Sequence, residues 1–499
     1  MASTVATASI FGIDAYSVDL EADVSPGLSA FLVVGLPDTA VQEARERVKS
    51  AMKHSDLPFP RTKITINLAP ADLRKAGTGF DLPMAIAILI TSGNLPALEP
   101  NVSMLAGELS LEGKLRPIAG ALSIALLASK LGYKEIILPE ANADEAALVP
   151  GLTVRAATSL KQVVEHLEKR NPLDAVETRI LDIRSDGAIG FDMANIRGQE
   201  QSKRALEIAA AGGHNILLQG PPGSGKTLLA RTLPSILPDL TTEESLEATR
   251  IHSVMGLLPT GGYLTTRPFR TPHHSASAIA LVGGGSIPKP GEISLAHRGV
   301  LFLDEFPEFP RTVLENLRQP LEDGTVTISR AQGTIHLPAR FLLVAAMNPC
   351  PCGYATDTDR HCTCTPVQID RYRKKLSGPL LDRIDLTIEV PKVQIEKLTD
   401  LEPGESSAEI RLRVQSARNR QMERYGKTNS ELSGEETRRN IMPDDDAREL
   451  LRQAVERFKL SARAYFRTLK VSRTIADIEQ AENVRIEHVA EALQYRQVA

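Results

Sequence analysis

The sequence lacks any long apolar run and any excess of positive charge. It has no stretch of about 18 or more uninterrupted apolar residues, so it predicts no membrane span. The first residues also lack the basic segment and the long apolar stretch of a secretory signal, so we expect a cytoplasmic protein. The net charge of −4 gives no global attraction to nucleic acid, so any DNA binding must depend on local patches.

Cysteine is also scarce, but its placement is informative. The chain has 4 cysteines, arranged as Cys350-Pro-Cys352 and Cys362-Thr-Cys364. A tetrahedral thiolate site needs four soft ligands in one small volume, and two closely spaced pairs can supply them. We therefore predict a structural zinc site formed by Cys350, Cys352, Cys362 and Cys364. Four unrelated reduced cysteines are the alternative, because Cys-x-Cys is a less common ligand pair than Cys-x-x-Cys.

A phosphate-binding loop is predicted between an apolar strand and a helix. Residues 220–227 read Gly-Pro-Pro-Gly-Ser-Gly-Lys-Thr and follow the run Ile216-Leu-Leu-Gln. Glycines let successive backbone N–H groups point at phosphate oxygens, and the following helix adds its positive end. Lys226 would contact the β- and γ-phosphates, and Thr227 would bind Mg²⁺. The predicted nucleotide-binding residues are Gly220, Pro221, Pro222, Gly223, Ser224, Gly225, Lys226, Thr227 and Asp304.

Two further apolar strands end in polar residues that complete this site. Gly299-Val-Leu-Phe-Leu ends in Asp304 and Glu305. Strands of this kind are buried in parallel sheets and place their terminal residues at the edge where ligands bind. Asp304 would hold the metal, and Glu305 would activate the attacking water. Asn348 closes a third apolar strand and can align the same water, although an asparagine before proline is also an ordinary turn residue.

The chain divides into three predicted regions joined by a polar linker. About three domains are expected from a length of 499 residues. Residues 1–170 alternate strands with helices, for example strand 63–68 and helix 38–53, which has Asp38 as its cap and apolar residues at helical spacing. Residues 171–190 resemble a linker, 191–400 form the α/β nucleotide core, and 401–499 are predicted to be helical. The last helix, 484–495, has Ile486, Val489, Ala490 and Leu493 on one stripe.

A long Gly- and Pro-rich stretch separates the phosphate loop from the acidic strand. It contains His273 and His274. This pair has no obvious third ligand, so loop packing or hydrogen bonding is favoured over metal binding. After the acidic strand, residues 324–337 predict a β-hairpin with Arg330 near its tip.

These motifs together resemble the magnesium-chelatase-like AAA+ ATPases, in particular the YifB/ComM branch. The resemblance rests on the phosphate loop, the Pro-His-His segment, Gly291-Glu-Ile-Ser-Leu-Ala-His297 with the acidic strand, the hairpin, and Leu380-Leu-Asp-Arg383. It implies a ring, expected to be a hexamer, with ATP between subunits. It also implies that Arg383 is an arginine finger for the neighbouring site and that Arg463, or alternatively Arg473, is the sensor arginine of the helical lid.

Residues 107–140 resemble the proteolytic domain of Lon-type proteases, which has a ribosomal S5 domain 2-like α+β fold. Lon-type peptidases use a serine activated by a lysine. Here Gly79 stands where the serine is expected, and Leu122, followed by Ser123, stands at the lysine position. Without a nucleophile and base in hydrogen-bond reach there is no covalent route. The resemblance therefore implies a proteolytically inactive domain.

The resemblance favours an ATP-driven DNA motor that branch-migrates recombination intermediates during natural transformation. The candidate DNA contacts are Arg330 and a helix, 406–424, that has Arg413, Arg420 and Arg424 on one face. That face can equally be a solvated helix surface. A magnesium-chelatase motor subunit and a protein-remodelling chaperone or protease regulator are the alternatives. We also expect the cysteine loop and the Arg330 hairpin to face the DNA-handling side together, with the phosphate loop distant from the cysteines.

Overall fold

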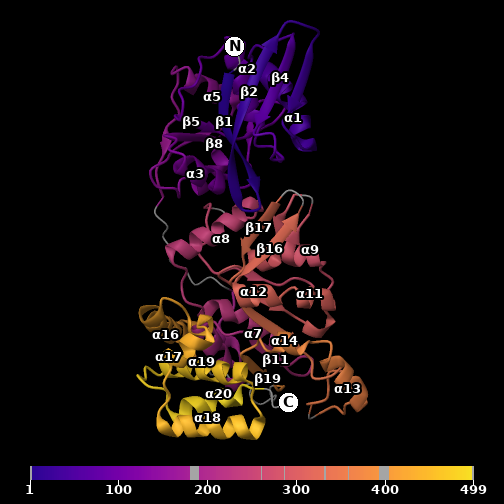
Figure 1. Cartoon of the computed structure of the whole chain (residues 1–499), viewed down its shortest axis with the longest axis vertical. Coiled ribbons are helices and arrows are strands. Elements are labelled where there is room, and N and C mark those ends of the chain that lie inside the picture. Colours follow the sequence, from indigo (N-terminus) through magenta and orange to yellow (C-terminus); the bar gives the residue numbers. More distant parts are fainter. Residues whose placement is uncertain are drawn as a thin grey trace.

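The computed structural model describes residues 3–179, 190–259, 261–285, 287–330, 333–357, 359–392 and 404–496. Three regions follow one another along the longest axis of the molecule, with the N-terminal region at one end and the C-terminal helices at the other (Figure 1). Within these described residues, every helix is too short or too polar to span a lipid bilayer. The predicted α/β core with a helical C-terminal region is confirmed.

The N-terminal region contains two four-stranded sheets. The first has the order β1-β2-β4-β3 and the second β10-β9-β8-β5. Their strands are β1 (Ser3–Phe11), β2 (Asp14–Ser25), β3 (Ala30–Val34), β4 (Lys63–Ala69), β5 (Ser103–Leu105), β8 (Glu135–Pro139), β9 (Thr153–Ala157) and β10 (Ala175–Val176), and a small ladder joins β6 (Glu108–Leu109) to β7 (Leu115–Arg116). The helices are α1 (Thr39–His54), α2 (Asp81–Thr91), α3 (Ala121–Lys130), α4 (Ala143–Ala146) and α5 (Leu160–Leu167), with the 3-10 turn η1 (Glu140–Asn142).

Helix α1 forms for the reasons that its sequence predicts. The Asp38 carboxylate accepts a hydrogen bond of 2.8 Å from the backbone N–H of Val41, which satisfies one free donor of the first turn. The apolar residues at helical spacing face the core and are fully buried. The second sheet, however, continues past the predicted end of this region. Strand β10 lies in the segment 171–190, which was predicted to be a linker, and it pairs with β9. Residues 180–189 of that segment lie outside the described residues.

The core is built around a parallel sheet of five strands in the order β12-β15-β18-β11-β19. The strands are β11 (Ile216–Gln219), β12 (Phe269–Arg270), β15 (Val300–Leu303), β18 (Leu342–Met347) and β19 (Leu386–Glu389). Its helices are α6 (Glu200–Gly212), α7 (Lys226–Thr232), α8 (Thr242–Val254), α9 (Ala278–Val282), α10 (Glu292–Leu295), α11 (Arg311–Glu315), α12 (Arg318–Asp323), α13 (Pro366–Arg373) and α14 (Gly378–Leu381), with the 3-10 turns η2 (Met193–Asn195), η3 (Leu233–Ile236) and η4 (Phe306–Glu308).

Two antiparallel ribbons lie outside this sheet. One is the short pair β13 (Gly283–Gly284) and β14 (Lys289–Pro290). The other is the predicted hairpin, formed by β16 (Thr325–Arg330) and β17 (Gly333–Pro338). Its last pair joins Arg330 to Gly333, so Arg330 is at the tip as predicted.

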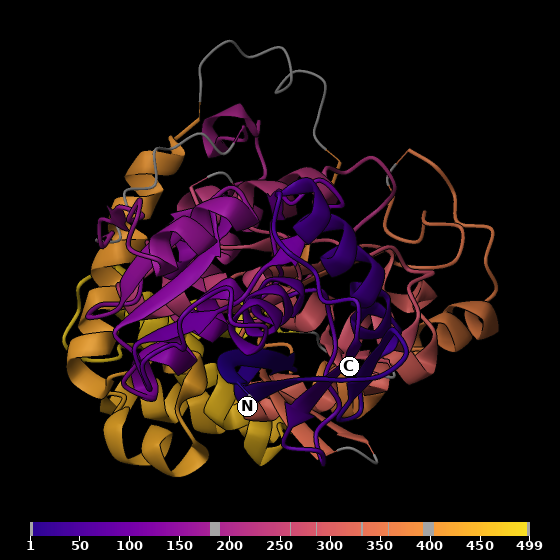
Figure 2. The same ribbon diagram turned by 90° about the horizontal axis from the view of Figure 1, so that it is seen from above.

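The C-terminal region is helical as predicted, and it shares a hydrophobic core with the sheet. Its helices are α16 (Ser407–Tyr425), α17 (Gly434–Asn440), α18 (Asp445–Phe458), α19 (Ala462–Ile478) and α20 (Ile486–Gln494), with η5 (Asn429–Glu431). Apolar residues of α16, α19 and α20 pack in one cluster with those of β11, β18 and β19. Seen along the long axis, the C-terminal helices lie on one flank of the core and α13 on the opposite flank (Figure 2).

The predicted apolar stripe of the last helix is wrong in part. Ile486 and Ala490 are exposed, whereas His488 is buried with Val489 and Ala492. The His488 ring accepts a hydrogen bond from the backbone N–H of Arg485 and lies 3.2 Å from Glu479, so its polar atoms are satisfied inside the protein. Because a hydrogen-bonded histidine can pack like an apolar residue, the buried face is rotated from the one that the apolar pattern indicated.

Candidate functional site

The phosphate loop follows β11 and ends where α7 begins. Gly225 has a φ of +87°, a backbone conformation that favours glycine. A Cβ on Gly220 would lie 2.2 Å from the carbonyl oxygen of Val390, so this position also requires glycine. The Ser224 hydroxyl is buried and has no hydrogen-bond partner within the described part of the chain. An unpartnered buried donor just before the N-terminus of a helix fits an oxyanion ligand such as phosphate.

Lys226 points across the loop to the end of β18. Its ammonium group donates hydrogen bonds of 2.8 Å to the carbonyl of Gly220 and 2.9 Å to that of Pro221. The side-chain oxygen of Asn348 lies 3.4 Å from the same nitrogen. Burial lowers the pKa of Lys226, and the nearby Asp304 carboxylate opposes that shift. The structure therefore brings Lys226 and Asn348 together, as the strand-end argument predicted.

The predicted Mg²⁺ ligands are in contact. The Thr227 hydroxyl donates a hydrogen bond of 2.8 Å to the Asp304 carboxylate. Mg²⁺ is held by oxygen ligands, commonly one or two protein groups together with phosphate oxygens and water. A hydroxyl and a carboxylate at this separation, next to the phosphate loop, fit that arrangement.

Glu305 is held by a residue whose part in the site the sequence did not reveal. The His274 Nδ1 atom lies 3.1 Å from a Glu305 carboxylate oxygen, and the tilted rings of His273 and His274 have centroids 4.1 Å apart. The pairing arises because β12 is the neighbour of β15, so the segment after β12 emerges at the edge that holds Glu305. Across the described chain, neither histidine belongs to a group of three possible metal ligands. The contacts of His274 with Glu305 and of His273 with Ser275 fit the expected hydrogen bonding of this pair.

Gln199 is a second residue that sequence reasoning missed. It precedes α6, and its side-chain amide donates hydrogen bonds to the carbonyls of Ser224, at 2.5 Å, and Pro391, at 3.3 Å. Its φ of +59° is unusual for a residue with a side chain, and strain of this kind persists where surrounding contacts fix it. Gln199 thus ties the phosphate loop to the chain after β19. Only the folded structure reveals this role, because a glutamine at the start of a helix has no distinctive sequence pattern.

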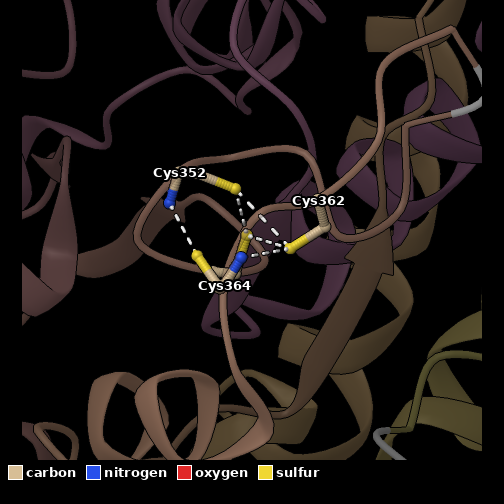
Figure 3. A group of neighbouring side chains, drawn as sticks. Cys352, Cys362 and Cys364 are labelled. Atoms are coloured by element: carbon tan, nitrogen blue, oxygen red, sulfur yellow. Dashed lines mark hydrogen bonds between the residues drawn. The ribbon is translucent and has the colours of Figure 1, made fainter.

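The four cysteines converge as predicted. Figure 3 shows the sulfur atoms of Cys352, Cys362 and Cys364 directed toward one another, and all four ligand atoms lie within 4.8 Å of each other. The Cys350 sulfur is 3.3 Å from that of Cys352 and 3.6 Å from that of Cys362. Tetrahedral zinc with Zn–S bonds of about 2.3 Å separates its sulfurs by about 3.8 Å, so the cluster fits this ion. Hydrogen bonds from the backbone of Tyr354 and Thr363 lower the pKa of Cys352 to about 5. For Cys362 and Cys364, backbone hydrogen bonds also lower the pKa, but burial and the neighbouring thiols together raise it.

The expectation that the cysteine loop is distant from the phosphate loop is wrong. A Cβ placed on Gly353 would come within 2.7 Å of the Pro222 ring and 3.9 Å of the Asn348 side chain. The cysteine loop follows β18, whose C-terminal end lies beside that of β11 in the parallel sheet. Both loops therefore leave the same edge and pack against each other.

The cysteine loop and the hairpin do not face the same side, contrary to expectation. The hairpin ends at Pro338, just before β18 begins at Leu342, whereas the cysteine loop starts after β18 ends at Met347. The two segments therefore lie at opposite ends of one strand. In Figure 1 the hairpin is next to the N-terminal region and α13, which follows the cysteine loop, is on the far side of the core.

Arg383 lies at the end of the sheet opposite to the phosphate loop. Its carbonyl accepts a hydrogen bond of 2.9 Å from the side chain of Asn215, the residue before β11. The four residues of β11 span about 13 Å and separate this point from the phosphate loop. The Arg383 guanidinium forms an ion pair with Glu322, and Arg463 lies 3.8 Å from the other oxygen of that carboxylate. Arg383 and Glu322 line an open cavity of about 580 Å³.

The remaining arginine candidates have different environments. Arg473 is buried, and donates to Asp477 and to the carbonyls of Ala481 and Glu482, so it ties α19 to the loop that follows this helix. Arg413 pairs with Glu207 at 2.7 Å and with Glu405, which ties α16 to α6.

The other three arginines proposed to contact DNA also differ in their environments. Arg424 pairs with Asp477 at 3.0 Å and is thus engaged within the chain. Arg330, at the hairpin tip, is exposed. Arg420 is half-exposed and forms no ion pair with any residue that the structure describes.

The positions aligned with the Lon-type catalytic pair have structural surroundings. Leu122 is fully buried, and a Cβ on Gly79 would have only ordinary contact with Ile118, at 3.9 Å. The Ser123 hydroxyl donates a hydrogen bond of 2.7 Å to the carbonyl of Ile13 and accepts one of 3.2 Å from Arg250 of the core. Ser123 therefore takes part in the contact between the N-terminal region and the core.

Comparisons with known proteins match all three regions. Family models described as subunit ChlI of magnesium chelatase match residues 20–142 and 192–398, and a model of the ChlI C-terminal part matches residues 404–496. The chain is 46% identical over 497 residues to YifB of Escherichia coli K12, covering 99% of this chain and 97% of that protein. The chain belongs to the YifB/ComM family of magnesium-chelatase-like AAA+ proteins.

Two further relatives of this YifB/ComM-family chain are informative. Competence protein ComM of Haemophilus influenzae is 46% identical over 488 residues, with 97% of this chain and 95% of that protein covered. Lon protease 2 of Thermus thermophilus is 27% identical over 198 residues, which are 38% of this chain and 23% of that protein. The chain is therefore similar to ComM over nearly its whole length and to the Lon protease over less than half of it.

Proposed function

We propose that this protein is a Mg²⁺-dependent ATP hydrolase. The observation that carries the proposal is the convergence of Lys226, Thr227, Asp304, Glu305 and Asn348 at one edge of the parallel sheet. Lys226 binds the β- and γ-phosphates, and Thr227 and Asp304 hold Mg²⁺, which neutralises charge on the phosphates when bound. Glu305 accepts a proton from the attacking water, and Asn348 orients that water.

We further propose that hydrolysis needs a neighbouring copy of the chain, in a ring that is expected to be hexameric. Arg383 is a full strand length away from its own phosphate loop, which supports its acting on the nucleotide of an adjacent subunit. A guanidinium matches the geometry and charge of a γ-phosphate. Arg463 shares the same carboxylate partner, so both arginines belong to one surface that can meet a neighbour's site.

The substrate that we propose is branched or single-stranded DNA, which the ring moves by branch migration during natural transformation. The name of the ComM relative supports a role connected with competence. The exposed Arg330 at a hairpin tip offers a cationic group to the phosphate backbone. Arg420 remains a candidate contact, whereas Arg413 is engaged within the chain.

ATP hydrolysis by the full chain, measured with different polymers, tests this function. We expect four-way or forked DNA to stimulate hydrolysis more than blunt duplex of equal length, with Glu305→Gln as the inactive control. Stimulation by unfolded polypeptide and not by DNA would overturn the proposal in favour of a protein-remodelling motor. Stimulation by neither polymer would favour a magnesium-chelatase-type motor subunit, the alternative supported by the three family models.

A further inference from the structure

The turn between β1 and β2, residues Phe11–Asp14, reaches from the N-terminal region into the core. Figure 1 shows the ends of β1 and β2 extending down to β17 and α8. A Cβ on Gly12 would come within 3.3 Å of Ile335, and one on Gly333 within 3.7 Å of the Phe11 ring. Ile13 is buried in the same apolar cluster as the hairpin residues Ile335 and Ile328. One side of the turn therefore packs against the β16–β17 hairpin.

The other side of this turn is held by helix α8. Arg250 of α8 forms an ion pair with Asp14 and donates a hydrogen bond of 3.2 Å to the Ser123 hydroxyl. The same hydroxyl donates to the Ile13 carbonyl at 2.7 Å. Arg250 is thus bonded to the turn both directly and through Ser123.

The end of α8 is fixed to the N-terminal region by buried polar groups. The Ser253 carbonyl accepts a hydrogen bond of 3.0 Å from the backbone N–H of Gly120. The Ser253 hydroxyl donates to the buried Glu145 carboxylate, which also accepts from the backbone N–H of Leu122 at 3.1 Å. Breaking such contacts leaves buried polar groups unsatisfied, which is unfavourable. Helix α8 is therefore fixed to the N-terminal region. It lies against Ser123, the residue after the position aligned with the Lon-type lysine.

We propose that the N-terminal region anchors the hairpin that carries Arg330, with the β1–β2 turn clamped between α8 and the tip end of the hairpin, at Gly333 and Ile335. Force on the hairpin tip then passes into the long antiparallel pair β1–β2 and does not bend the hairpin against the core. This assigns the Lon-like region an intramolecular partner. Its consequence for DNA handling rests on the function proposed above.

Hydrogen exchange of the full chain tests the anchor without reference to DNA. In Arg250→Ala, which is not on the hairpin, we expect amides of residues 325–330 and 333–338 to exchange about tenfold faster. Arg250→Lys should restore most of the protection because it keeps a cation beside Asp14. The matched control is Arg448→Ala, which removes an exposed arginine that pairs with Asp445 on α18. Equal hairpin exchange in Arg250→Ala and Arg448→Ala overturns the anchor.

A pair of hairpin variants separates anchoring from simple loss of packing. Ile335 and Ile328 are direct cross-strand partners, but Ile335 faces Gly12 of the N-terminal region and Ile328 faces Gly283 of the core. Under the proposal, Ile335→Ala should speed exchange in the β1–β2 turn, whereas Ile328→Ala should leave the turn unchanged. Equal effects of both variants on the turn overturn the proposal.

ATP hydrolysis then tests the functional consequence. We expect Arg250→Ala to keep the basal hydrolysis rate, while the factor by which DNA stimulates hydrolysis falls about tenfold. Arg448→Ala should keep both quantities. Full DNA stimulation in Arg250→Ala overturns the role in force transfer. Absence of stimulation in the unaltered chain overturns the proposed function instead, and the exchange experiment alone then decides the anchor.

Discussion

Gly353 of the cysteine loop lies directly against Pro222 of the phosphate loop, so closely that a Cβ on the glycine would come within 2.7 Å of the proline ring. The two loops follow neighbouring parallel strands, β18 and β11. The predicted zinc site therefore adjoins the nucleotide site. This contact makes the state of the cysteine cluster relevant to ATP binding.

Gly353→Ala should weaken ATP binding. Gly353 has a φ of +88° and no room for a Cβ, so a methyl group strains the backbone and displaces Pro222. We expect ATP affinity, measured by calorimetry, to fall about tenfold, in line with strain of about 1 to 3 kcal/mol. The control is Gly426→Ala, where φ is +66° but nothing lies within 4 Å of the added atom. Similar losses in both variants would contradict the contact.

The cysteine cluster should hold one zinc ion per chain. Replacing Cys350 and Cys364 by serine removes two of the four ligands, so elemental analysis should find the metal lost. Because Gly353 touches Pro222, ATP affinity should fall together with zinc content. Purified unaltered protein without zinc would refute the site, and unchanged ATP affinity after zinc loss would refute its link to the phosphate loop.

Lys226→Ala and Glu305→Gln should separate binding from hydrolysis. The first removes the positive charge that meets the phosphates, so ATP binding should be lost. The second keeps the size of the side chain and removes the base, so binding should remain while hydrolysis falls by about 100-fold or more. Direct binding and turnover measurements on both variants check this. Equal losses of ATP affinity would contradict the assigned roles.

Arg383→Ala should lower hydrolysis by a factor on the order of 10³, as expected for an arginine finger. Since its site belongs to a neighbour, mixing Arg383→Ala with Lys226→Ala should recover activity at mixed interfaces. Titration of one variant into the other, followed by ATPase assays, measures this recovery. Failure of every mixture to regain activity would argue that each chain hydrolyses ATP alone.

His274→Ala should lower turnover without changing the affinity for ATP, because His274 contacts Glu305 and not the phosphate loop. The loss should be on the order of tenfold, since a misplaced base reacts less often. His274→Asn retains a donor near the position of Nδ1 and should recover most of the rate. His273→Ala, which removes the neighbouring ring and its hydrogen bonds with Ser275 but leaves the His274–Glu305 contact, is the control. A roughly tenfold rise in KM for ATP with an unchanged kcat in His274→Ala would refute a positioning role.

The order of motifs along the chain was sufficient to predict much of the core. Alternating apolar strands and polar strand ends predicted the sheet edge that brings Lys226, Asp304 and Asn348 together. Local chemistry also predicted the Asp38 cap and the hairpin with Arg330 at its tip, because such features depend on residues a few positions apart. The stripe of the last helix was not predicted correctly, because a buried histidine with satisfied nitrogens does not stand out from polar surface residues.

The sequence by itself thus determined the phosphate loop, the acidic strand, the clustered cysteines and the succession of α/β and helical regions. Only the tertiary structure decided which of these segments touch. It placed His274 on Glu305, Gly353 on Pro222, Arg383 at the far end of the sheet, and the β1–β2 turn between α8 and the hairpin. Such contacts depend on strand order and on the end of a strand at which a loop emerges, and neither is encoded by residues near one another in the chain.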